Sequence, residues 1–236
     1  MRLLPALGLI LLLAGCQPEE RREAIPETAD GTSVLWPQWD YEAAARRGSD
    51  VYRLTPGSSN IDIIAGREGP MARFGHDHVI SLYAAEGFLT ISKPLSGSRG
   101  EVRFRVADLK VDEAGKRRQY RLDSEPDSND IESTRNNMLY RVLEANQWPY
   151  VFVSINHIDS GPNGWSADIE FRVKDRAFQA RLPFSLVKAQ GSVRVFGEMA
   201  LKQSELGLEP FSVLGGGLRV ADELRIHFNL AGHLIQ

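Results

Sequence analysis

The chain has 236 residues, of which 42% are hydrophobic and 25% are charged, a balance typical of a globular protein with one sizeable domain. The formal net charge of −3 and the lack of a basic stripe argue against a nucleic-acid partner. The sequence contains a single cysteine, which excludes a disulfide within the chain.

The first 15 residues have the pattern of an export signal. Arg2 provides a positive start, and the apolar run Leu3–Leu13 follows it. As a helix this run rises only about 16 Å, too short for a hydrocarbon core of about 30 Å. A short apolar run of this kind is typical of a signal peptide, to which we assign residues 1–15.

The sequence Leu13-Ala14-Gly15-Cys16 resembles the lipobox of bacterial lipoproteins, which are cut just before the cysteine. The resemblance implies that Cys16 is the lipid attachment site and carries enough acyl chains for stable anchoring. The alternative is a plain signal peptide followed by an incidental cysteine. We expect a location in the cell envelope, facing the periplasm. Gln17 favours the outer membrane, because an Asp there commonly holds lipoproteins at the inner membrane.

Residues 16–48 are predicted to form a tether, and residues 49–236 a single domain. The tether is polar and contains prolines and turn sequences. Near its end, Asp40–Arg47 is expected to form a short helix that Asp40 caps and Gly48 ends.

From residue 50 onward, apolar and polar residues alternate, which predicts β-strands with one dry face and one wet face. The alternation is clearest over residues 165–173, 193–201 and 224–230. A change of phase near Ala107 or Asp108 predicts a β-bulge. Short turns separate about eight or nine strands, so neighbouring strands should be antiparallel and form a barrel or a sandwich.

One segment has a helical period instead. Residues 127–146 carry an apolar stripe made of Ile131, Met138, Leu139, Val142 and Leu143. Asp127 or Asp130 can cap the start of this helix, and Trp148-Pro149 ends it. A helix of about five turns inserted between strands could lie across a barrel mouth.

Three stretches together resemble the YceI-like family of envelope proteins. They are Phe74-Gly75-His76-Asp77-His78-Val79-Ile80 with Glu86–Ile91, the helix from Asp130 to Leu139 followed by Trp148–Ser154, and Ser204–Leu208 followed by Val220–Ile226. They occur in the family's order across residues 50–233. The resemblance implies an all-β fold with one inserted helix: an extended, antiparallel, lipocalin-like β-barrel of about eight strands. In some members of the family its cavity holds a lipid or a polyisoprenoid chain.

An eight-stranded barrel is just wide enough to hold one slender ligand. In a hollow barrel of this kind, the cavity-lining residues would be Phe104, Trp165, Ile169, Phe171, Phe184, Leu224 and Phe228. The alternative is that these side chains fill the interior, because an apolar stripe alone does not distinguish a packed core from an occupied tunnel.

His76 and His78 are two residues apart, so in a strand both side chains point to the same face, about 7 Å apart. We interpret them as residues of the cavity mouth that could make polar contacts with a lipid head group, or that close a turn. The alternative is a metal site, which would need a third ligand from His157, His227 or His233. Because no spacing forces these residues together, we expect no metal, and no cofactor other than a bound lipid or polyisoprenoid.

The sequence lacks a Gly-x-Ser-x-Gly elbow, a phosphate loop and a His-Glu-x-x-His motif, so we expect no enzyme activity. The leading hypothesis is a membrane-anchored periplasmic protein that binds a lipid or isoprenoid chain. The alternatives are a metal-binding envelope protein that uses His76 and His78, and an adaptor lipoprotein with a packed barrel. The expected partners are a hydrophobic ligand and the membrane, through acylated Cys16. The oligomeric state stays open, a homodimer included.

Overall fold

The computed structural model describes residues 36–161 and 164–235. Its strands are β1 (Val51–Leu54), β2 (Asn60–Glu68), β3 (His78–Leu82), β4 (Glu86–Thr90), β5 (Arg99–Arg105), β6 (Lys110–Val111), β7 (Tyr150–Gly161), β8 (Gly164–Val173), β9 (Arg176–Ala189), β10 (Ser192–Lys202), β11 (Ser212–Val213) and β12 (Leu218–Ile235). Its longer helices are α1 (Gln38–Arg46), α2 (Ala114–Gln119) and α3 (Ser128–Asn136), the last continued by a π-helical segment (Asn137–Val142). The predicted signal peptide and Cys16 lie outside the described residues.

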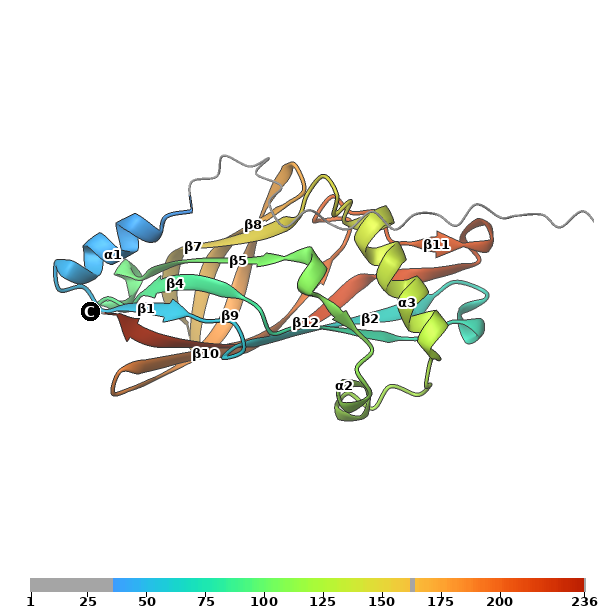
Figure 1. Cartoon of the computed structure of the whole chain (residues 1–236), viewed down its shortest axis with the longest axis horizontal. Coiled ribbons are helices and arrows are strands. Elements are labelled where there is room, and N and C mark those ends of the chain that lie inside the picture. Colours follow the sequence, from blue (N-terminus) through green and yellow to red (C-terminus); the bar gives the residue numbers. More distant parts are fainter. Residues whose placement is uncertain (1–35, 162–163, 236) are drawn as a thin grey trace, which may run out of the picture.

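The strands close into an elongated antiparallel barrel (Figure 1). The ring runs β1-β4-β5-β7-β8-β9-β10-β12, and β12 pairs with β1 to close it. Beyond β1, strand β12 also pairs with β2, which pairs with β3, which pairs with β6. Since β1 leads into β2, β3 into β4 and β5 into β6, these elements are three long strands, each interrupted once. This arrangement confirms the prediction of an antiparallel barrel of about eight strands.

The three interruptions lie side by side. The break between β1 and β2 contacts the break between β3 and β4, where the amide of Gly57 donates to the carbonyl oxygen of Tyr83 at 2.6 Å. The break between β5 and β6 is one turn of 3-10 helix, Val106–Asp108. The sequence predicted a β-bulge at this place, and this prediction is wrong, because the chain forms a helical turn there. The change of phase is real, but a helical turn produces it.

The inserted helix begins where the sequence predicted and ends earlier. The side chain of Asp127 caps α3 by accepting hydrogen bonds from the amides of Asn129 and Asp130 at 2.8 and 2.9 Å. The helical segment ends at Val142 and not at Asn146, because its second half is wound as a π-helix and Glu144 adopts a left-handed backbone conformation (φ 49°).

Helix α3 completes the barrel wall beside β6. This two-residue strand pairs only with β3, so its other edge is left without a strand among the described residues. Arg135 of α3 donates to the carbonyl oxygens of Ala107 and Leu109 at 2.7 and 3.4 Å, next to that edge. A helix thus occupies the place that a strand has elsewhere in the wall.

The end of the predicted tether packs on the barrel. Helix α1 begins at Gln38, so Asp40 lies in its first turn and is not its cap as predicted. Tyr41 is almost fully buried, and its ring stacks on Phe88 of β4 with the centroids 5.2 Å apart. Trp36 contacts the same phenylalanine. None of the helices within the described ranges has both the length and the apolarity needed to cross a bilayer.

Candidate functional site: an internal cavity with a polar wall

A cavity of about 470 Å³ lies inside the barrel, a size in the range of small-molecule sites. It is lined by β2 and β3 and reaches Val102 of β5 and Ile155 of β7. Around β1 the interior is filled by side chains, among them Tyr52, Leu54 and Leu89, which are buried and do not line the cavity. The cavity therefore ends against a packed core on that side, and the hypothesis of a solidly packed barrel is wrong.

Most of the predicted lining residues face the cavity. The ones that line it are Phe104, Ile169, Phe171, Leu224 and Phe228. Trp165 and Phe184 do not line it. They oppose each other on β8 and β9, where Phe184 is buried in the core and Trp165 is 37% exposed. Alternation predicts which face of a strand points inward, but not how far along the strand a cavity extends.

The cavity is also lined by residues that the sequence did not predict, among them two groups of different origin. Ile61, Ile63 and Ala65 of β2 are spaced by two, so a period of two could have suggested them, although the apolar Ile64 weakens the pattern. The second group comes from the inserted helix and from loops, and includes Met138 and Phe211. A strand period carries no signal for such residues, because their position depends on tertiary packing.

The mouth of the cavity has an exposed apolar rim. Phe74 and Val213 line the cavity and are also exposed, and the neighbouring Leu214 is 64% exposed. These residues lie on two adjacent loops, which are joined by a 2.8 Å hydrogen bond from the amide of Met71 to the carbonyl oxygen of Gly217. Exposed apolar groups at a cavity entrance are typical of sites that admit apolar ligands.

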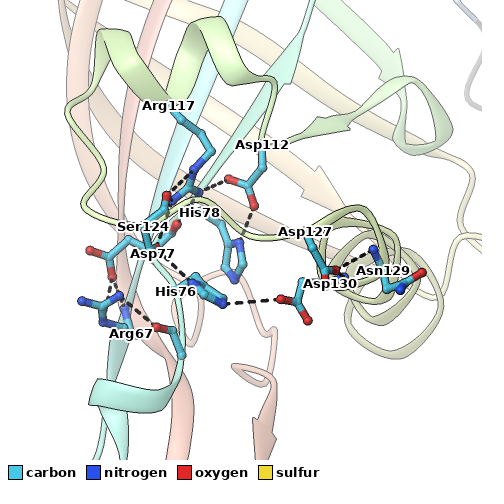
Figure 2. Close-up of polar contacts among 11 residues, drawn as sticks. Arg67, His76, Asp77, His78, Asp112, Arg117, Ser124, Asp127, Asn129 and Asp130 are labelled. Atoms are coloured by element: carbon cyan, nitrogen blue, oxygen red, sulfur yellow. Dashed lines mark hydrogen bonds and ion pairs between the residues drawn. The ribbon is translucent and has the colours of Figure 1, made fainter.

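One wall of the cavity is polar and is organised around Asp112 (Figure 2). The Asp112 carboxylate is fully buried. It accepts hydrogen bonds from Nδ1 of His78 at 2.6 Å, from the amide of Val79 at 3.0 Å and from Arg117 at 2.5 Å. Burial raises the pKa of Asp112, but these hydrogen bonds outweigh it, so the pKa lies below its usual value. The carboxylate is therefore ionised and fixes the ring of His78.

His76 lies beside His78 on the same wall, as the sequence predicted, and both residues line the cavity. The two rings are edge to face, with centroids 6.3 Å apart. Nδ1 of His76 is 2.9 Å from the hydroxyl of Ser124, and Nε2 is 3.6 Å from Asp130 of α3. Contact of either ring with a ligand stays a prediction.

The other histidines are elsewhere. His157 is exposed and pairs with Asp159, and His227 packs on the ring of Tyr120. His233 opposes Ser192 and Arg53 at the far end of β12. In the part of the chain that the structure describes, no group of three or more His, Cys, Asp or Glu residues could hold a metal ion. The metal hypothesis therefore gains no third ligand there.

The fold is similar to that of solved structures. The crystal structure of Burkholderia cenocepacia BcnA matches with a TM-score of 0.57 over 75% of this chain and 98% of that chain, at 13% identity. A polyisoprenoid binding domain from Saccharophagus degradans, implicated in plant cell wall breakdown, matches with a TM-score of 0.52 over 78% of this chain and 98% of that one, at 10% identity. No family model matches the chain, and no curated protein matches its sequence. At these identities the structural likeness establishes the fold alone, and it confirms the barrel that the YceI-like resemblance implies.

Proposed function

We propose that this protein binds one lipid or isoprenoid chain in its barrel cavity and catalyses no reaction on it. The observation that carries the proposal is the apolar cavity with its exposed apolar rim. Burying an apolar chain there would remove it from water, which stabilises a complex by about 25 cal/mol per Å² of apolar surface. The similar domain from Saccharophagus degradans, which is described as binding polyisoprenoid, adds support.

The shape of the cavity favours a long ligand over a compact one. On β12 alone, the lining residues run from Leu218 to Leu230. Twelve residues of fully extended strand would span about 40 Å, and the bulge between Val220 and Leu224 shortens this to about 33 Å. A cavity of about 470 Å³ that follows the wall over such a length is narrow, and a narrow apolar space fits an extended chain.

The proposed place of action is the periplasmic face of a membrane, with the outer membrane favoured over the inner one. The lipobox resemblance around Cys16 and the glutamine that follows it support this location. Acylation of Cys16 would hold the barrel near a source of apolar ligands. Mass spectrometry of the N-terminal peptide tests it: we expect an acylated Cys16, and a Cys16→Ser variant should leave the membrane fraction. An unmodified Cys16 would contradict the anchor without touching the binding proposal.

Binding is tested on the full chain, gently extracted from bacterial membranes. Native mass spectrometry should show a mass excess, and solvent extraction should release a lipid with a long apolar chain. A matched preparation of an unrelated lipoprotein controls for carried-over membrane lipid. A protein that has no bound lipid and takes up no added polyprenyl chain would contradict the proposal.

A further inference from the structure

We propose that the cavity selects a chain that ends in a neutral hydroxyl group, which His78 and His76 bind, and that it discriminates against a phosphate at that position. This inference rests on the proposed function and adds the chemical class of the head group. It follows from the hydrogen bonds that engage Nδ1 of both rings, whose residues line the cavity, and from the pairing of the charged groups around them.

His78 presents a hydrogen-bond acceptor. Its Nδ1 donates to the buried carboxylate of Asp112 at 2.6 Å, so the proton of the neutral ring is on Nδ1. Nε2 then carries the lone pair. Within residues 36–161 and 164–235, Nε2 makes no hydrogen bond, and the residue lines the cavity. Figure 2 shows the ring held by Asp112 at one side, with its other side directed away from that carboxylate.

His76 presents a hydrogen-bond donor. Arg117 donates to the hydroxyl oxygen of Ser124 at 3.2 Å, so the hydroxyl proton is free to point to Nδ1 of His76 at 2.9 Å. That assignment leaves the ring proton on Nε2, the nitrogen on the side of Asp130. The two rings, 6.3 Å apart, thus offer one donor and one acceptor. A hydroxyl group is both acceptor and donor, and it complements the pair.

The neighbouring surface of α3 and of the π-helical segment that continues it is polar, and its lining residues are mostly uncharged. Ser133, Thr134 and Asn137 line the cavity next to Asp130. Their hydroxyl and amide groups can complete the hydrogen bonds of a neutral head group. The remaining lining is largely apolar, so this wall is where a polar chain end would be stabilised.

The charges around this wall disfavour an anion. The two guanidinium groups among the lining residues are already paired, Arg67 with Asp123 at 2.7 Å and Arg219 with Glu68 at 2.7 Å. Asp130 lies on the wall itself, 3.6 Å from the donor nitrogen of His76. Within the described residues, a phosphate would therefore meet a carboxylate and no unpaired lining arginine, whereas phosphate sites usually offer cations and clustered amides.

The test measures binding of three radiolabelled probes with the same saturated chain: phytanol, phytanyl phosphate and the hydrocarbon phytane. The full chain is delipidated and reconstituted in nanodiscs, and empty nanodiscs provide the blank. We expect the alcohol to bind about tenfold more tightly than the hydrocarbon, which corresponds to about one hydrogen bond. The phosphate should bind more weakly than the alcohol.

The variant His78→Asn tests whether His78 causes the preference for the alcohol over the hydrocarbon. The asparagine amide can replace Nδ1 as the donor to Asp112, but it has no group in the place of Nε2. We expect this variant to lose the tenfold preference for the alcohol and to keep its affinity for phytane. His157→Asn, on the exposed surface, is the matched control and should behave like wild type.

The outcomes separate this inference from the proposed function. Equal binding of all three probes, or tighter binding of the phosphate, overturns the head-group inference and leaves the chain-binding proposal intact. An unchanged preference in a folded His78→Asn variant overturns the role of His78. Binding of none of the three overturns both. If His78→Asn does not fold, the wild-type series alone decides whether the head group is a neutral hydroxyl.

Discussion

His78 and Asp112 connect two neighbouring strands of the barrel: Nδ1 of His78 on β3 is 2.6 Å from Oδ2 of Asp112, the residue after β6. The backbone reinforces the contact, because the amide of Asp112 donates to the carbonyl oxygen of Val79 at 2.8 Å. Asp112 has a left-handed backbone conformation (φ 55°), which Asp and Asn tolerate better than most residues. One carboxylate thus joins β3 to the residue after β6 and orients a ring on the cavity wall.

Replacing Asp112 by asparagine should destabilise the barrel. The substitution keeps the shape and the backbone preference, but it leaves the buried Arg117 without its anionic partner. Breaking a buried ion pair in this way costs about 3–5 kcal/mol. Urea unfolding followed by circular dichroism measures it. Asp159→Asn is the control, because Asp159 also pairs with a histidine and an arginine but is exposed, and it should change nothing measurable.

The free energy of unfolding should decrease at acid pH, because Asp62 becomes protonated there. Its buried carboxylate accepts hydrogen bonds from Lys116 and Ser81 at 2.7 Å and from Tyr120 at 2.8 Å. Burial raises the pKa of Asp62, but these hydrogen bonds outweigh it, and the folded-state pKa is lowered. A lowered pKa stabilises the fold above the unfolded-state value of about 3.9. The contribution is lost as the pH falls through the folded-state pKa.

Asp62→Asn provides the comparison for this pH dependence. At neutral pH the variant should be about 3 kcal/mol less stable than wild type. The difference should begin to shrink below about pH 4, where the Asp62 carboxylate of the unfolded wild-type chain becomes protonated, and it should disappear once the pH falls through the lowered folded-state pKa. Denaturant midpoints at a series of pH values measure both chains. A difference that stays constant down to the acid limit would show that Asp62 does not act through its charge.

A bulky side chain in the cavity should displace the ligand. Val153 on β7 lines the cavity, so a Val153→Trp side chain would extend into the space that the chain is proposed to occupy. We expect retained lipid to fall at least about tenfold, a loss of about 1.4 kcal/mol in binding. Lipid extraction and mass spectrometry measure the content. Val187→Trp, at an exposed position on β9, should retain the wild-type amount, and equal retention by both variants would place the ligand elsewhere.

Truncation of Tyr41 should release α1 from the barrel. The stacked contact with Phe88 is the main buried contact of this helix, so Tyr41→Ala should cost about 3 kcal/mol locally. Amide hydrogen exchange over residues 38–46 should speed up by about a hundredfold while β5 to β12 stay protected. The neighbouring Trp39 is 77% exposed, and Trp39→Ala should leave exchange unchanged. Global loss of protection would contradict a local role.

Two glycines should respond to alanine in opposite directions. A Cβ at Gly87 would lie 2.2 Å from the carbonyl oxygen of Glu101 on the neighbouring strand, so Gly87→Ala should cost about 3 kcal/mol. Gly115 lies in α2, and a Cβ at this residue would meet no other atom of the described chain within 4 Å. Gly115→Ala should therefore stabilise the chain by about 0.5–1 kcal/mol, through the helix propensity of alanine. Thermal unfolding of both variants gives the comparison.

The amphipathic strands were sufficient to predict an antiparallel barrel or sandwich, and the resemblance to the YceI-like family favoured the barrel. Where one face is dry and one is wet, as from Trp165 to Val173, the period of two determines both the strand and its inward side. The interrupted strands were harder to recognise. β6 has two residues, and beside its pairing with β3 the Asp112 side chain accepts a hydrogen bond from the amide of Val79, a contact that no local pattern reveals.

The candidate site was predictable in part. The pair His76 and His78 was visible, because two like residues at a spacing of two share a face in a strand. Both residues do line the cavity, although β3 begins only at His78. Their partners were not, since Asp112, Ser124 and Asp130 all come from the inserted segment after β6. Which residues of such a segment meet a strand is decided by how it packs, and sequence separation carries little information about it.

Strand β12 comes after every other strand in the sequence, yet it is the neighbour of β1, β2 and β10. Two hydrogen bonds join β12 to the loop between β1 and β2. The hydroxyl of Ser58 donates to the carbonyl oxygen of Ala231 at 3.2 Å, and the amide of Ala231 donates to the hydroxyl oxygen of Ser59 at 3.0 Å. Contacts between residues so far apart in sequence make folding slow. We expect that, until β12 docks, the apolar inner faces of the other strands are exposed to water and can associate with other chains. The cavity is therefore enclosed only when residues 218–235, the last to be synthesised of all the strands, have paired with β1, β2 and β10.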